Sequence, residues 1–140
     1  MCFILFSMTP LEGKRWIQAA ATDLNAAQSL LKDGYHHLCA FHAQQAAEKA
    51  LKGLLRLLSH APWGHNCLNL LTQVAGLLAG SVTPSALFDA AQRLDAHYIP
   101  SRYPDAFPTG VPADHYDALI AQQAIDDATA ILAFVDKHTP

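Results

Sequence analysis

The sequence has little charge and few cysteines, and both shortages narrow the classes of protein to which it can belong. Charged residues make up 15% of the 140 residues, and the formal net charge is −3. This balance excludes a protein that attracts nucleic acid with its whole surface, although it allows a local basic patch. The three cysteines, at positions 2, 39 and 67, are an odd number without a Cys-x-x-Cys pair. Because such cysteines are typical of reduced thiols, we expect a cytoplasmic protein.

Several motifs of catalysis, metal binding and membrane insertion are also missing. No Walker loop, Gly-x-Gly-x-x-Gly or Gly-x-Ser-x-Gly sequence occurs, which removes the commonest signatures of nucleotide-dependent enzymes and hydrolases. The eight histidines form no His-x-x-x-His or His-Glu-x-x-His pattern, so we expect no metal site and no cofactor. No apolar run reaches the roughly 18 to 20 residues of a membrane span. Residues 1–7 are apolar but lack the basic region and cleavage site of a signal peptide, so we expect no membrane contact.

Alanine and leucine are abundant while β-branched residues are few, which favours helices. A hydrophobic share of 51% is enough to bury one core. Apolar residues at three- and four-residue spacing predict five helices. The first is capped by Thr9 and stopped at Gly34, the second covers residues 35–59, and the third runs from Leu68 to Gly80. The fourth begins at Thr83-Pro84 and the fifth at Ala113-Asp114. We therefore predict an all-α, antiparallel up-and-down bundle of four to five helices over residues 9–138, with residues 1–8 as a tail or an upstream start.

The connection before the last helix is long and rich in proline. Four prolines between residues 97 and 113 predict that this segment is not helical. Loops of this length are often functional, and the aromatic residues in Tyr-Ile-Pro-Ser-Arg-Tyr-Pro-Asp, residues 98–105, indicate that it packs against the bundle. In the last helix we expect these residues to face inward: Tyr116, Leu119, Ile120, Ala124, Ile131 and Val135.

The second predicted helix carries a strip of polar and basic residues on one face. At 100° per residue the strip contains His42, Gln45, Lys49, Lys52 and Arg56, and Glu48 lies beside it within reach of Lys52. Cationic groups one turn apart can follow the phosphates of a ligand. The alternatives are a solvated helix face, or an interface between copies, because residues 1–88 carry a net charge of +2 and residues 89–140 a net charge of −5.

Arg102 and Tyr103 lie between Pro100 and Pro104, where the backbone is stiff. The guanidinium of Arg102 can bind a phosphate or carboxylate with two hydrogen bonds, and Tyr103 or Tyr98 can stack on a base. The alternative is that Arg102 only fixes the loop, through loop carbonyl groups or Asp105.

Three stretches resemble the HEPN family (higher eukaryotes and prokaryotes nucleotide-binding). They are Ala-x-x-Asp-Leu at residues 20–24, Phe-His-Ala-Gln-Gln-Ala-Ala-Glu-Lys-Ala-Leu-Lys at 41–52, and Leu-Asp at 94–95 followed by residues 98–105. The resemblance covers residues 9–138, and His65 matches a histidine common in the family ahead of the third helix. It implies a helical bundle that forms a homodimer or a larger homo-oligomer, and an association with nucleotides or RNA. It also implies a minimal nucleotidyltransferase as partner, in a two-component system that resembles toxin–antitoxin pairs.

Some branches of this family are metal-independent RNases, recognised by an arginine, four to six residues and a histidine, which supply a cation and a base. This sequence lacks that spacing. Four residues do separate His97 from Arg102, but in the reversed order, with the histidine first. We therefore expect a binding module without catalysis. Its expected nucleotide or phosphate contacts are Gln45, Lys49, Lys52, Arg56, His65, Arg102 and Tyr103. The alternative is a metal-independent endoribonuclease that uses Arg102 with His97 or His115.

Overall fold

The structure, a computed structural model, describes residues 10–78 and 80–140. Within these residues it is built from five α-helices and two short 3-10 helices, without a strand. The elements are α2 (Pro10–Lys32), α3 (His36–Leu57), α4 (Cys67–Leu77), α5 (Ser85–Asp95), η1 (Pro104–Ala106), η2 (Pro112–His115) and α6 (Ala118–His138). The predicted all-α bundle is confirmed. The predicted helix cap Thr9 and the predicted tail, residues 1–8, lie outside the described residues.

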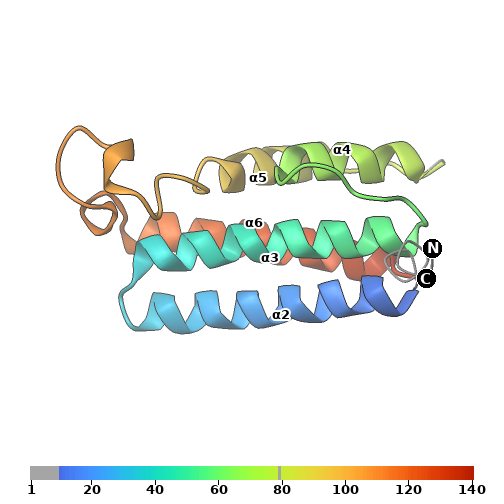
Figure 1. Ribbon diagram of the computed structural model, residues 1–140, viewed down its shortest axis with the longest axis horizontal. Coiled ribbons are helices and arrows are strands. Elements are labelled where there is room, and N and C mark those ends of the chain that lie inside the picture. The colour runs from blue at the N-terminus through green and yellow to red at the C-terminus, as the bar shows by residue number, and fades with distance from the viewer. Residues whose placement is uncertain (1–9, 79) are drawn as a thin grey trace, which may run out of the picture.

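Helix α3 lies at the centre of the bundle and touches every other α-helix (Figure 1). It forms an antiparallel pair with α2 through a turn at Gly34, whose φ of 85° suits glycine. The connection over residues 58–66 returns along α3, so α4 starts beside the middle of α3 and runs in the same direction (Figure 1). Helices α5 and α6 then complete the core, which is rich in alanine and leucine.

Helices α2 and α3 approach each other closely at two glycines. A Cβ atom added to Gly53 of α3 would lie 2.7 Å from the carbonyl oxygen of Gly13 of α2 and 2.7 Å from Cγ1 of Ile17. A Cβ atom added to Gly13 would lie 2.8 Å from the carbonyl oxygen of Gly53. The absence of side chains at both positions therefore sets the distance between the two helices.

The predictions for residues 97–120 were wrong in part. Ala113 and Asp114 do not begin the last helix but belong to η2, a single turn that Pro112 starts and Asp114 closes by accepting a hydrogen bond from the amide of Val111. The segment is therefore not entirely free of helix. Helix α6 begins later, after Asp117, whose carboxylate accepts a hydrogen bond from the amide of Ile120 at 2.8 Å.

Two residues expected to face inward lie on the surface of α6. The side chain of Leu119 is 81% exposed and that of Ile120 is 37% exposed. Leu119 lies on the same face of α6 as the exposed residues Gln122, Gln123 and Asp126. Ile120 lies in the first turn ahead of Ala121, where the buried stripe begins. The predicted inward positions Ala124, Ile131 and Val135 are buried as expected.

By length and composition alone, α6 is long and apolar enough to cross a membrane. Its buried residues, from Ala121 to Val135, pack in the core of the bundle. The core helix of a compact domain has the same properties. The apolar character of α6 is therefore accounted for by the fold.

Candidate functional site

The predicted strip on α3 contacts α2 and the loops instead of projecting freely into water. Lys49 Nζ lies 2.6 Å from Oδ2 of Asp23 on α2, and His42 Nδ1 lies 3.1 Å from Oδ1 of the same carboxylate. Asp23 is the acidic residue of the Ala-x-x-Asp-Leu stretch. The Lys49 side chain remains 31% exposed, so its charge is partly neutralised but still accessible.

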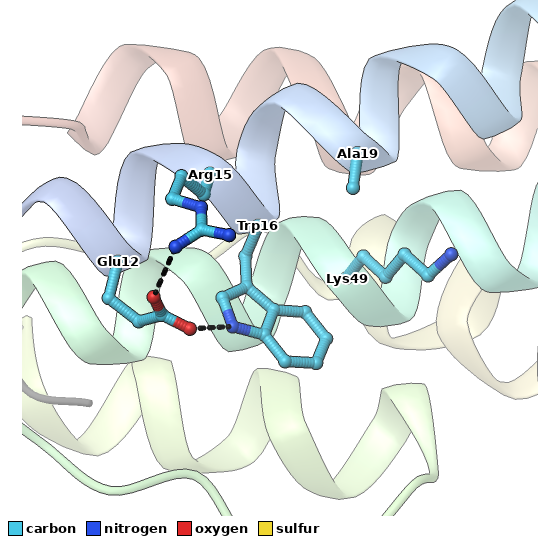
Figure 2. Close-up of a pocket in the computed structure, with 5 residues that line it drawn as sticks. All are labelled: Glu12, Arg15, Trp16, Ala19 and Lys49. Carbon is cyan, nitrogen blue, oxygen red and sulfur yellow. Dashed lines mark hydrogen bonds and ion pairs between the residues drawn. The ribbon is translucent and has the colours of Figure 1, made fainter. Parts of the chain in front are cut away.

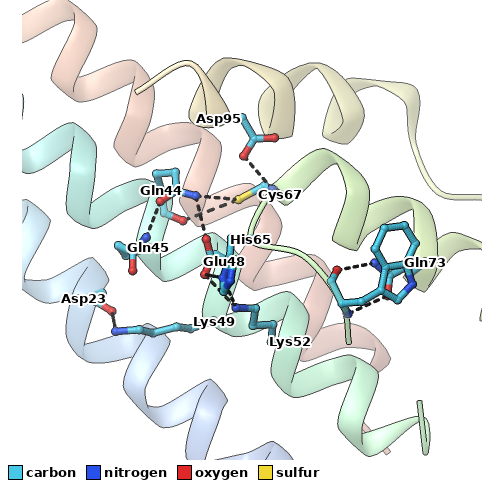
Figure 3. Close-up of polar contacts among 11 residues, drawn as sticks. Asp23, Gln44, Gln45, Glu48, Lys49, Lys52, His65, Cys67, Gln73 and Asp95 are labelled. Atoms are coloured by element: carbon cyan, nitrogen blue, oxygen red, sulfur yellow. Dashed lines mark hydrogen bonds and ion pairs between the residues drawn. The ribbon is translucent and has the colours of Figure 1, made fainter. Parts of the chain in front are cut away.

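Lys52 is buried in a charged cluster between α3 and the loop that precedes α4 (Figure 3). Its ammonium lies 3.0 Å from Oε2 of Glu48, which is also buried, and 3.0 Å from Nδ1 of His65. The predicted pairing of Lys52 with Glu48 is confirmed. The interpretation of this part of the strip as a solvated face was wrong, because the returning loop covers it.

The contact with Lys52 determines where His65 carries its proton. An ammonium group only donates hydrogen bonds, so Nδ1 of His65 must accept and the proton of the neutral ring lies on Nε2. The side chain of His65 is 76% exposed. His65 therefore presents its Nε2–H donor at the surface, in a ring orientation that the contact with Lys52 fixes. Oε2 of Glu48 lies 3.7 Å from Nδ1 of the same ring.

Gln45 joins the same network through Gln44 (Figure 3). The amide of Gln45 donates to Oε1 of Gln44 at 2.7 Å, and Nε2 of Gln44 donates to Oε1 of Glu48 at 3.3 Å. Gln44 is fully buried and also touches the thiol of Cys67. Burial raises the pKa of the Cys67 thiol well above its usual value, so this cysteine stays protonated.

The N-terminus of α4 is already occupied by an anionic group of the chain. Both oxygens of Asp95, at the end of α5, accept hydrogen bonds from the amides of Cys67 and Leu68, at 2.7 and 2.9 Å. The carboxylate satisfies the free amides of the helix and complements its dipole. The role of Asp95 in this part of the chain is therefore to fix α4 on α5.

Arg56, at the end of the predicted strip, packs on an aromatic ring of α2. Its guanidinium carbon lies 4.7 Å from the centroid of Trp16, and the ammonium of Lys52 lies 5.6 Å from the same centroid. The indole nitrogen donates to Oε1 of Glu12 at 3.2 Å. Trp16 also lines an open hollow of about 330 Å³ with Glu12, Arg15, Ala19 and Lys49 (Figure 2).

Arg102 is surrounded by three aromatic rings. Its guanidinium carbon lies 4.5 Å from the ring centroid of Phe41, 4.6 Å from that of Tyr98 and 4.9 Å from that of Tyr103. The Nε group donates to the carbonyl of Tyr98 at 3.0 Å, so the predicted contact with a loop carbonyl is present. Within residues 10–78 and 80–140 the terminal amino groups make no hydrogen bond or ion pair, and they remain available to a ligand.

A hollow of about 250 Å³ lies beside Tyr98, one of the three rings around Arg102. It is lined by His65, Asn66, Asp95, Tyr98 and Ile99. His65 thus shares this hollow with Tyr98, and the guanidinium of Arg102 lies over the ring of the same tyrosine. The fold thus brings an imidazole N–H, a phenol ring and a guanidinium to one place.

The two histidines of the alternative, catalytic interpretation are used in packing. Nδ1 of His97 lies 2.8 Å from the hydroxyl of Tyr116, and burial raises the pKa of that hydroxyl to about 12. Nε2 of His115 lies 2.8 Å from the carbonyl of Thr109, and its ring stacks on Phe107. In the described part of the chain no hydrogen bond or ring contact joins either histidine to Arg102.

We expect the stability of the fold to decrease at acidic pH because of His97. Burial lowers the pKa of this ring below 6.5, while the charge of Asp127 opposes the shift. Below about pH 6.5 the unfolded chain then binds more protons than the folded chain, so the free energy of unfolding falls with pH. Thermal unfolding between pH 7.5 and 5 should show a smaller loss of Tm for His97→Gln than for the unmodified chain. His115→Gln, at an exposed position, should follow the unmodified chain; equal slopes for all three would contradict this prediction.

Metal ligands do not gather in this structure. Over residues 10–78 and 80–140 no group of three His, Cys, Asp or Glu side chains is placed to hold a metal ion.

Sequence reasoning missed two of the aromatic and acidic residues at the site. Trp16 fits the apolar spacing of the first helix, which does not distinguish a core residue from one that lines a site, and it is only partly buried. The role of Asp95 was also not predicted, because its partners on α4 come from a distant part of the sequence.

The class of protein is defined by an all-α bundle whose central helix carries this strip, in which Asp95 caps helix α4 and the chain has an Arg-Tyr-Pro-Asp loop. The HEPN domain model matches residues 14–138, and the chain belongs to the HEPN domain family. Among solved structures it is similar to TT1696 from Thermus thermophilus, with 44% identity and a TM-score of 0.84 over 91% of this chain and 98% of that one.

Two further solved structures have the same fold. ST0689, an archaeal HEPN homologue, is 34% identical with a TM-score of 0.76 over 91% of this chain and 98% of that one. The HEPN domain protein TM0613 from Thermotoga maritima is 28% identical with a TM-score of 0.69, over 88% and 95%. No curated protein matches the chain.

Proposed function

We propose that this HEPN domain is a binding module for a nucleotide or a short RNA. The observation that carries the proposal is the hollow lined by His65 and Tyr98, together with Arg102, whose guanidinium carbon lies 4.6 Å from the centroid of the same tyrosine. A phosphate accepts hydrogen bonds from the Nε2–H of His65 and the amino groups of Arg102. A base stacks on Tyr98 or Tyr103, both of which lie against the guanidinium.

Lys52, Lys49 and Gln45 support this site in different ways. Lys52 is buried and fixes the ring of His65, so we assign it the positioning of a donor and not a direct contact with the ligand. Lys49 is partly exposed and adds positive charge, which Asp23 reduces. Gln45 is only partly buried and, through Gln44, belongs to the network that orients Glu48.

We favour binding over RNA cleavage because the histidines proposed for cleavage take part in packing. Burial lowers the pKa of His97, whose ring faces Tyr116, and the ring of His115 stacks on Phe107. A general base must reach the ribose 2′-hydroxyl next to the cation that stabilises the phosphorane. Neither ring has a contact with Arg102 in the described part of the chain.

Replacing His65 by alanine tests the site directly. Because the Nε2–H of His65 donates to a charged phosphate in this proposal, His65→Ala should weaken the binding of ATP or a short RNA by about tenfold. The measurement is fluorescence anisotropy with labelled nucleotide and RNA. His138→Ala is the matched control, because His138 lies in the last turn of α6 and lines a different hollow with Val82. Equal affinities of the two variants would count against the proposed site.

We also propose a minimal nucleotidyltransferase as partner, in a two-component system that resembles toxin–antitoxin pairs. Membership of the HEPN family supports this, as does a site whose donors suit the phosphates of a nucleotide. Pull-down with this chain as bait should retain a minimal nucleotidyltransferase from the same genome, and the His65→Ala variant should retain less.

For self-association we propose the outer face of α5 and α6. A hollow of about 410 Å³ there is lined by Arg93, Ala96, His97, Leu119, Ile120 and Gln123. Leu119 projects from the same face with 81% of its surface exposed. A twofold axis brings one patch against its own copy, so the projecting leucine of each chain can fill the hollow of the other.

This self-association is expected to depend on Leu119. Leu119→Asp places a charge in the apolar contact and should convert a dimer into a monomer, because an unpaired charge is costly to bury. The measurement is light scattering after size-exclusion chromatography. Gln28→Asp, at an exposed position on α2, is the control. If both variants keep the mass of the unmodified protein, the interface lies elsewhere or the protein does not form oligomers through this face.

A further inference from the structure

The hollow beside Trp16 lies between α2 and α3, and of its lining residues the proposed function uses Lys49 alone. Its walls combine one aromatic ring with charged groups from two helices, Arg15 and Glu12 of α2 and Lys49 of α3 (Figure 2). Arg15 is 70% exposed along its side chain, and Ala19 leaves space next to the indole. The hollow thus offers a stacking surface with two cations at its rim, of which Arg15 lies 3.6 Å from Glu12 and Lys49 lies 2.6 Å from Asp23.

Contacts within the molecule connect this hollow to the site around Tyr98. The ammonium of Lys52 lies 5.6 Å from the Trp16 centroid and 3.0 Å from Nδ1 of His65. His65 in turn shares a hollow with Tyr98, on which Arg102 is stacked. The two aromatic groups are therefore the ends of one strip and not two unrelated surface features.

The length of the strip indicates the size of its ligand. Arg102 lies over Phe41 and Arg56 over Trp16, and the interval from Phe41 to Arg56 corresponds to roughly 22 Å at the helical rise of about 1.5 Å per residue. A mononucleotide is too short to reach both ends. A strand stacked at a rise of about 3.4 Å needs about six to seven steps, and therefore about seven to eight nucleotides, to cover the distance, whereas an extended strand needs fewer.

We propose that the strip binds a single-stranded RNA of about four to six nucleotides, with one base stacked on Trp16 and another on Tyr98 or Tyr103. This inference rests on the proposed function and adds the Trp16 hollow to it as a second subsite. Aromatic surfaces at both ends, with positive charge between them, are the combination that binds single strands with little sequence preference. An acidic peptide would use the charges but not the two stacking surfaces.

The fluorescence of Trp16 provides a direct test. The chain has two tryptophans, and Trp63 lies exposed on the loop before α4, so Trp63→Phe leaves Trp16 as the only indole. Oligouridines of two, four, six and ten nucleotides are titrated into this variant. We expect affinity to rise up to about six nucleotides and quenching of Trp16 to begin at about four. Equal quenching by UMP and by the hexanucleotide at the same concentration would overturn the inference.

Variants at position 16 separate this inference from the proposed function. Trp16→Leu should weaken hexanucleotide binding at least about fivefold and leave dinucleotide binding within twofold, because only the longer strand reaches the hollow. Trp16→Tyr should restore most of the affinity, which shows that loss of stacking and not misfolding is responsible. Hexanucleotide binding that is unchanged in Trp16→Leu overturns the second subsite alone. The absence of binding for every RNA and for ATP overturns the proposed function as well.

Discussion

Gly53→Ala should destabilise the protein by about 3 kcal/mol, the upper end of the usual range for overpacking. The added Cβ would lie 2.7 Å from the carbonyl oxygen of Gly13 and 2.7 Å from Cγ1 of Ile17. A backbone oxygen cannot rotate away as a flexible side chain can, so α2 must move relative to α3. For a domain of this size, we expect Tm to fall by about 10 °C.

The matched control for this prediction is Gly76→Ala. Gly76 lies in α4, and a Cβ atom added there meets nothing within 4 Å. Alanine is the better helix former, so this variant should gain about 0.5 to 1 kcal/mol. Thermal or urea unfolding measures both variants. A loss at Gly53 no larger than about 1 kcal/mol would mean that the two helices do not depend on close approach at this crossing.

Lys52→Met should destabilise the protein by about 3 kcal/mol, because it leaves a buried carboxylate without its cation. Glu48 is 6% exposed, and its Oε2 loses a hydrogen-bonded ammonium at 3.0 Å. The amide of Gln44 and the ring of His65 remain near the carboxylate, which keeps the expected loss at the lower end of the range for a broken buried pair.

A second substitution distinguishes the loss of charge balance from the loss of packing. In the double variant Glu48→Gln with Lys52→Met the buried charge is removed, while Gln44 still finds an acceptor at position 48. We expect this variant to recover about 2 kcal/mol of the loss, since neutral replacements of buried ion pairs are often tolerated. Urea unfolding of the single and double variants gives the comparison. No recovery in the double variant would show that the lysine contributes by packing alone.

The helices could be predicted from the sequence because each has a clear apolar stripe and a defined end. Helix α2 begins at Pro10 and ends two residues before Gly34, and α4 ends three residues before Gly80. The antiparallel pair of α2 and α3 follows from the short turn between them. The last helix was placed too early because Ala113 and Asp114 fit its spacing. Whether a proline begins an α-helix or a single 3-10 turn depends on local hydrogen bonds such as that of Asp114, which spacing does not show.

The candidate site could be predicted in its residue types but not in its contacts. The spacing on α3 correctly placed Lys49 and Lys52 on one strip, yet it could not show that one is partly open and the other buried. That difference comes from the loop over residues 58–66, which returns along α3 and places His65 on Lys52. Likewise the rings around Arg102 include Phe41, a residue of a distant helix. Pair contacts of this kind depend on tertiary structure and leave no local periodicity.

The central claim, that the site around His65, Tyr98 and Arg102 binds nucleotides or RNA without cleaving RNA, is tested most directly by one titration. Purified protein is titrated with ATP, GTP and a single-stranded RNA at about 50 and 200 mM salt, and the RNA is checked for cleavage in the same samples. We predict intact RNA and binding that weakens with salt, because phosphate contacts release counterions. Metal-independent cleavage in proportion to the amount of protein would contradict the account, and so would the absence of binding at either salt concentration.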